Sequence, residues 1–94
     1  MTDYDALIIG GGHNGLICAA YLAKAGKKVA VFEAKDTLGG CASTREITPG
    51  FEVSGCAQWL HQLSPAIIKD LQLDLHGLKY AARDLPTVAL GDNG

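Results

Sequence analysis

Apolar residues form two short uninterrupted runs near the start of the chain, with a longer apolar stretch between them. The runs 6–9 (Ala-Leu-Ile-Ile) and 29–32 (Val-Ala-Val-Phe) show no alternation of polar and apolar positions, which is typical of parallel strands covered on both faces. Residues 16–25 are mostly Ala, Leu, Ile, Cys and Tyr, and Gly26 follows where a left-handed residue closes a helix. The pattern predicts strand, helix and strand, one βαβ unit over residues 4–33 with a right-handed crossover.

The remaining two thirds of the chain carry weaker patterns. Residues 43–54 alternate polar and apolar positions around a Thr-Pro-Gly turn, which predicts a hairpin. Ser64 is followed by proline, the combination of an N-cap with proline at the first helical position, and predicts a helix over residues 65–72. Two short stretches, residues 79–82 and 87–90, predict strands. The predicted fold class is therefore α/β.

Composition narrows the class of protein. The chain has 94 residues, of which 48% are hydrophobic and 19% are charged, so it is too apolar for intrinsic disorder. Its net charge of −2 offers no basic patch for a nucleic acid. Glycines interrupt the longest uncharged run, residues 6–23, so we expect no transmembrane segment. Residues 1–5 contain two aspartates and no basic residue, which argues against a signal or transit peptide.

The three cysteines show neither a CxxC pair nor zinc-like spacing. We therefore expect no metal site and no disulfide scaffold, and a reducing, cytoplasmic location fits best. Cys18 lies in the apolar helix and is expected to be a small core residue. Cys41 would need a partner four or five residues later to act as a redox disulfide, but the next cysteine is Cys56. No pair of nucleophile and base emerges from the sequence, so the catalytic residues stay unknown.

The main chemical signal is a GxGxxG motif between the first predicted strand and the helix. Gly10 permits a tight turn out of the strand, Gly12 lets the backbone approach a pyrophosphate, and Gly15 lets the helix lie close to the strand. The helix N-terminus then presents unpaired N–H groups and a partial positive charge to phosphates. His13 lies in the first turn, where we expect it to be neutral or solvent-facing because an imidazolium would oppose the helix dipole.

Glu33 completes this motif at the end of the second predicted strand, eighteen residues beyond Gly15. A carboxylate there can accept hydrogen bonds from both hydroxyls of an adenosine ribose, and it would repel the 2′-phosphate of NADP. The alternative is a solvated strand end. Gly39 and Gly40 form a second, weaker signal, because a glycine pair can bring backbone N–H groups to the same diphosphate. The alternative for that pair is a surface loop.

The residues of these motifs resemble the start of a known family. Residues 7–16 (LIIGGGHNGL) and 20–29 (AYLAKAGKKV), followed by Leu-Gly-Gly at 38–40 and Pro-Gly-Phe at 49–51, are similar to phytoene desaturase-type FAD-dependent oxidoreductases. Within that family, the resemblance is greatest to the subgroup called pyridine nucleotide-disulfide oxidoreductase domain-containing protein 2. The histidine-asparagine pair that ends in Asn14 makes the match more specific than a bare GxGxxG.

The resemblance implies FAD bound in an extended form, with hydride chemistry on carbon–carbon or carbon–nitrogen bonds, as in dehydrogenases, desaturases and amine oxidases. It assigns the cofactor-binding residues as the glycine motif, the ribose carboxylate and the glycine doublet: Gly10, Gly12, Asn14, Gly15, Glu33, Gly39 and Gly40. Related amine-oxidase-type enzymes carry arginines beside the doublet, where this chain has Thr37 and Cys41.

Members of that family are several times longer, so residues 1–94 are expected to be a partial FAD-binding domain, without the rest of the cofactor domain and without a substrate domain. The helix at 16–25 supports this independently, because its single charge leaves no polar outer stripe. We expect its apolar faces to contact the remainder of an enzyme or a second copy, and the chain alone to be inactive. Two alternatives stay open: a non-enzymatic nucleotide-binding or interaction module, and an NAD-binding unit.

Overall fold

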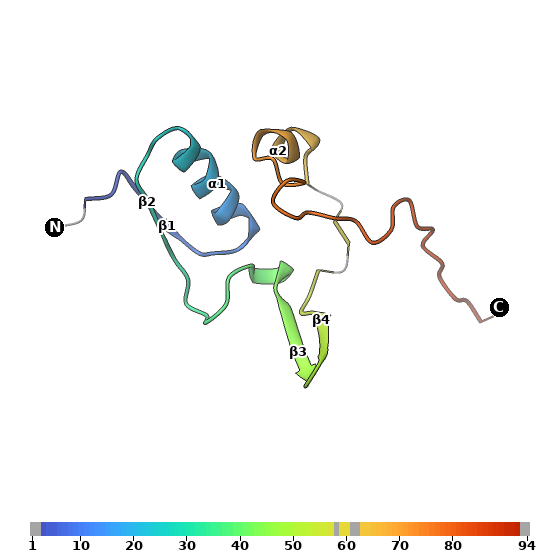
Figure 1. Ribbon diagram of the computed structural model, residues 1–94. Helices are drawn as coiled ribbons and strands as arrows, with labels where there is room; N and C mark the ends of the chain where they lie inside the picture. The colour runs from blue at the N-terminus through green and yellow to red at the C-terminus, as the bar shows by residue number, and fades with distance from the viewer. Residues whose placement is uncertain (1–2, 58, 61–62, 93–94) are drawn as a thin grey trace. The chain divides into compact units, whose positions relative to one another are not determined.

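The computed structural model of the chain describes residues 3–57, 59–60 and 63–92, and it divides into two compact units, Met1–Leu63 and Ser64–Gly94. The first unit contains a parallel strand pair with a helix between its strands, and an antiparallel hairpin (Figure 1). The second contains a short helix. This is the α/β architecture predicted from the sequence. Within the described residues, no helix is both long enough and apolar enough to cross a membrane.

The βαβ unit consists of β1 (Ala6–Ile9), α1 (His13–Lys24) and β2 (Val29–Phe32). The two strands run parallel and are paired in register along their whole length. The predicted strands are confirmed, and the helix begins three residues earlier than the start of the predicted stretch at Leu16. His-Asn-Gly is a poor helix-forming tripeptide, but first-turn N–H groups need no partner inside a helix, so these residues can occupy that turn.

The C-terminal end of α1 closes as the glycine predicts. Gly26 has φ +81°, in the left-handed region. Its N–H donates to the carbonyl of Ala23 at 2.9 Å, and the N–H of Lys27 donates to the carbonyl of Leu22 at 3.0 Å. These two bonds form a Schellman motif, which satisfies the last carbonyls of the helix and turns the chain into β2.

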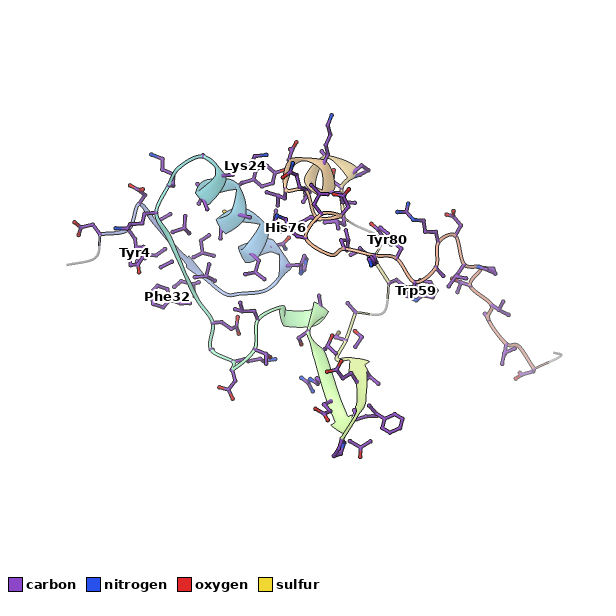
Figure 2. All side chains as sticks on the ribbon, viewed as in Figure 1. Tyr4, Lys24, Phe32, Trp59, His76 and Tyr80 are labelled. Atoms are coloured by element: carbon purple, nitrogen blue, oxygen red, sulfur yellow. The ribbon has the colours of Figure 1, made fainter. Side chains whose placement is uncertain are left out.

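α1 covers one face of the strand pair. A methyl group at Gly15 would lie 3.3 Å from the side chain of Ile8, which points toward the helix. On the other face, the exposed fractions are 61% for Leu7, 84% for Ile9 and 54% for Phe32. Figure 2 shows Phe32 on the side of the strands that faces away from α1. No apolar side chain in the described residues is buried, so this unit has an uncovered apolar sheet face instead of a closed core.

Cys18 corrects one prediction, because it is exposed instead of lying in a core. It lies on α1 at a position that the strand pair does not cover, and the described residues provide no second layer there. An apolar helix therefore does not by itself show which of its faces is buried.

The segment after β2 forms a short 3₁₀ turn, η1 (Gly40–Ala42), and then the hairpin of β3 (Thr44–Thr48) and β4 (Phe51–Ser54). The strands pair antiparallel with an irregularity between Glu46 and Thr48. The hairpin predicted over residues 43–54 is confirmed.

The second unit, Ser64–Gly94, is described by itself. Its helix α2 (Pro65–Asp70) starts as predicted, with the Ser64 hydroxyl accepting the N–H of Ala66 at 3.2 Å, and ends two residues short of the predicted range. The strands predicted at 79–82 and 87–90 are wrong, because both stretches are irregular. A strand exists through hydrogen bonds to a neighbouring strand, and the described part of this unit contains no strand to pair with.

Candidate functional site

The candidate site lies where β1 and β2 both end, at the carboxyl edge of the strand pair. Gly10 leaves β1 with φ +101°, a backbone conformation that side chains rarely adopt. Its N–H donates to the carbonyl of Phe32 at 2.7 Å, which fixes the turn to the end of β2. A methyl group on Gly15 would overlap the carbonyl oxygen of Gly10. The geometry therefore requires the first and last glycines of the motif for the reasons given by the sequence.

The N-terminus of α1 opens from this turn. Gly12 is its N-cap and provides no side chain to bond the first N–H groups, and the first turn contains no acidic residue. His13 and Asn14 are both exposed there. Around Gly12 there is room, because an added methyl group would meet only the Cα of Gly40, at 3.9 Å. Free N–H groups, a positive helix end and open space are what an anion needs.

Glu33 is tied to the glycine turn by a hydrogen bond that the sequence does not reveal. The N–H of Gly11 donates to its Oε2 at 2.6 Å, and the N–H of Lys35 donates to its Oε1 at 3.2 Å. These two bonds, of which the one from Gly11 has the larger effect, lower the pKa of the Glu33 carboxyl below its ordinary value of 4.5. The group is thus an anion near neutral pH, and each oxygen keeps acceptor capacity for a further donor.

Gly11 is the functional residue that the motif analysis misses, because it occupies an unspecified position of GxGxxG. It is buried, and a side chain on it would collide with the side chain of Leu38 and crowd the Glu33 carboxylate. Three consecutive glycines are the sequence signal, since the motif itself needs only two of them. Gly11 fastens the phosphate turn to the ribose carboxylate.

The glycine doublet packs directly on the same turn. The N–H of Gly39 donates to the carbonyl of Gly11 at 2.8 Å, and Gly39 forms a parallel β-bridge with Gly12. Gly39 and Gly40 have φ +113° and +57°, and a methyl group on Gly40 would lie 3.1 Å from the Cα of Gly12. The structure thus brings together the three sequence signals, which are separated by up to thirty residues, in one backbone cluster.

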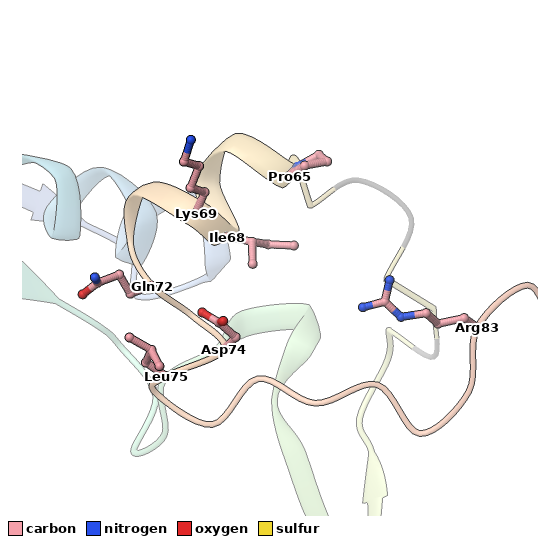
Figure 3. Close-up of a pocket in the computed structure, with 7 residues that line it drawn as sticks. All are labelled: Pro65, Ile68, Lys69, Gln72, Asp74, Leu75 and Arg83. Atoms are coloured by element: carbon pink, nitrogen blue, oxygen red, sulfur yellow. The ribbon is translucent and has the colours of Figure 1, made fainter.

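The described residues contain no group of three or more metal-ligating side chains. Their three cysteines are free thiols. A shallow hollow occurs in the second unit (Figure 3) and was not predicted from the sequence. It is open to solvent, has no nucleotide-binding motif, and is lined by Pro65, Ile68, Lys69, Gln72, Asp74, Leu75 and Arg83.

Comparison with protein families identifies the strand-turn-helix architecture. A sequence profile described as an NAD(P)-binding Rossmann-like domain matches residues 8–72. This chain belongs to that family. The matched range includes the glycine turn, Glu33 and the doublet, so the cluster described above is the nucleotide-binding edge of a Rossmann-like domain.

Relatives with known names extend the comparison. The chain is 51% identical to pyridine nucleotide-disulfide oxidoreductase domain-containing protein 2 of Mus musculus over 82 residues, 87% of this chain and 14% of the relative. It is 40% identical to a limonene dehydrogenase polypeptide of Castellaniella defragrans over 91 residues, 96% of this chain and 16% of that protein. It is also 40% identical to (S)-6-hydroxynicotine oxidase of Paenarthrobacter nicotinovorans over 81 residues, 84% of this chain and 19% of that protein.

The predicted resemblance to the first of these proteins is confirmed, and the relatives include oxidoreductases by name. The chain spans less than a fifth of the length of each of them.

Proposed function

We propose that this chain binds the ADP half of FAD as the N-terminal part of a flavin-dependent oxidoreductase. The observation that carries the proposal is the hydrogen-bonded cluster of the glycine turn, Glu33 and the doublet at the carboxyl edge of β1 and β2. In parallel α/β sheets, nucleotides bind beyond this edge.

Each part of the cluster suits one part of the ADP group. The N-terminus of α1, with Gly12 and Asn14, would receive the diphosphate, because its N–H groups are unpaired inside the helix. Glu33 would accept hydrogen bonds from the ribose hydroxyls with the acceptor capacity that Gly11 and Lys35 leave. The doublet would bring further backbone to the diphosphate from the side of Gly39 and Gly40.

FAD is proposed over NAD because the doublet is bonded to the phosphate turn and because of the resemblance to phytoene desaturase-type oxidoreductases. The flavin, when bound, would supply the hydride-accepting ring, and the residues around that ring would come from outside this chain. Activity is therefore proposed for a longer protein, a dehydrogenase, desaturase or amine oxidase. The second candidate is an NAD-binding unit, which the family description favours.

The uncovered apolar face of β1 and β2 supports a further part of the proposal. Parallel sheets are covered on both faces in folded proteins, and this face exposes Leu7, Ile9 and Phe32. We propose that the remainder of an enzyme, or a second copy of the chain, covers it.

The decisive experiment is titration calorimetry of the 94-residue chain with ADP, FAD, NAD and NADP, with circular dichroism as the control for folding. The proposal expects ADP and FAD to bind and NADP to bind far more weakly, because Glu33 repels a 2′-phosphate. Binding of NAD with no binding of FAD would support the second candidate. A folded chain that binds none of the four would refute both.

A further inference from the structure

The charges around the phosphate turn leave one residue with a task beyond the proposed function, on which this inference rests. The turn itself, residues 10–15, contains no lysine or arginine. The unit's basic residues Lys24, Lys27 and Lys28 lie where α1 ends and β2 begins, at the opposite edge of the strand pair. A diphosphate with two negative charges would thus meet an edge whose anchored side chain, Glu33, is itself anionic.

His13 is the titratable side chain of this turn. It is the first residue of α1, directly after Gly12, and it is exposed. In the free protein the helix dipole disfavours a cation at this end. A bound diphosphate reverses the local sign, because two negative charges outweigh the half charge of the helix end. Imidazole is the side chain whose charge changes near neutral pH.

We infer that His13 is a phosphate-binding residue that takes up a proton from solvent when a diphosphate binds, so that cofactor affinity rises as pH falls. The nucleotide site does not rest on the helix end alone, since the family profile and the backbone cluster both include it. The inference adds a side chain that supplies charge there, in a chain that has Cys41 and Thr37 beside its doublet.

The other charged or titratable groups on the packed elements are few. β1 contributes none next to the turn, β2 is followed by Glu33, the next loop contributes Lys35 and Asp36, and η1 contributes Cys41. Carboxylates and lysines keep their charge between about pH 6 and pH 8. A thiol can begin to ionise at the upper end of that range, so the measurements are repeated in a Cys41→Ser background.

The test is titration calorimetry with ADP-ribose, a diphosphate diester without a phosphate that titrates in this range, at about pH 6, 7 and 8. We expect the Kd to fall about threefold to tenfold from pH 8 to pH 6, the size of a partly exposed charge interaction. At pH 7 the binding enthalpy should vary with the ionisation enthalpy of the buffer, which measures the proton uptake directly.

Four comparisons separate the possible outcomes. His13→Gln should bind with no pH dependence, and His13→Lys should bind tightly at every pH, which a merely structural role would not produce. His76→Gln, at an exposed histidine of the second unit, should retain the wild-type slope. Adenosine, which lacks phosphate, should show no slope with any variant. A slope that persists in His13→Gln, or its absence in the wild type, overturns the inference while leaving the proposed function intact. A folded chain that does not bind ADP-ribose overturns both.

Discussion

Gly12 and Gly15 differ in what an added methyl group would meet, and this difference separates binding from folding. At Gly15 the methyl group would overlap the carbonyl oxygen of Gly10 and lie 3.3 Å from Ile8. The backbone is the obstacle, so relief requires α1 to move away from β1. At Gly12 the nearest atom is the Cα of Gly40 at 3.9 Å, an ordinary contact, and φ is −76°, which alanine adopts without strain.

The stability cost follows from this geometry. Gly15→Ala should lower the free energy of unfolding by about 1–3 kcal/mol, the scale of overpacking in a tight site. Gly12→Ala should lower it by less than about 1 kcal/mol, since alanine is a somewhat poorer N-cap than glycine. For binding the order reverses, because the new methyl group of Gly12→Ala occupies the space through which a diphosphate would approach the turn.

Urea denaturation followed by circular dichroism measures the first effect, and calorimetry with ADP measures the second. Gly12→Ala should remain folded and lose at least about tenfold in affinity, comparable to one lost charge-assisted hydrogen bond. Equal destabilisation by both variants would refute the steric argument. Wild-type affinity in Gly12→Ala would remove the turn from the binding site.

Three other predictions test separate parts of the cluster. Glu33→Gln should weaken ADP binding by about tenfold to a hundredfold; unchanged titration curves would exclude the ribose role. The lowered pKa of Glu33 stabilises the fold above its ordinary value of 4.5 and loses this contribution as pH falls through the lower folded-state pKa, so an acid titration of Glu33→Gln should show a smaller loss of stability than the wild type. Ile9→Asn, at a residue 84% exposed on the uncovered sheet face, should reduce self-association in light scattering by weakening an apolar contact of about 1.5–3 kcal/mol, whereas Val88→Asn, an equally apolar change 76% exposed in the other unit, should leave it unchanged.

The βαβ unit could be predicted because local and global requirements agree there. Continuous apolar runs, a glycine turn and a glycine after the helix each predict the same local structure, and nineteen residues between the strands suffice for a crossover. The strands predicted at 79–82 and 87–90 rested on apolar composition alone. Composition does not supply a partner strand, and without one the described chain there stays irregular.

The candidate site was predictable by residue type but not by its internal bonds. The motif names Gly10, Gly12, Gly15 and Glu33, because each has its own requirement at a fixed spacing. The bond between Gly11 and Glu33, at 2.6 Å, depends on how two strand ends meet in space. Spacing also could not show that Gly39 bridges to Gly12, since that contact depends on the path of the loop between them.

These internal bonds connect ligand binding to stability. No apolar side chain in the described residues is buried, so the site is held by backbone hydrogen bonds among Gly10, Gly11, Glu33 and Gly39 instead of by a packed core beneath it. Such a cluster forms when β1 and β2 are paired, and it disappears when they separate. A ligand that bridges α1, Glu33 and the doublet would therefore bind the paired state alone, and its binding free energy would add directly to the stability of the strand pair. Cofactor binding and folding are one equilibrium in this unit, and that equilibrium gives the apolar face of the sheet a fixed shape for whatever covers it.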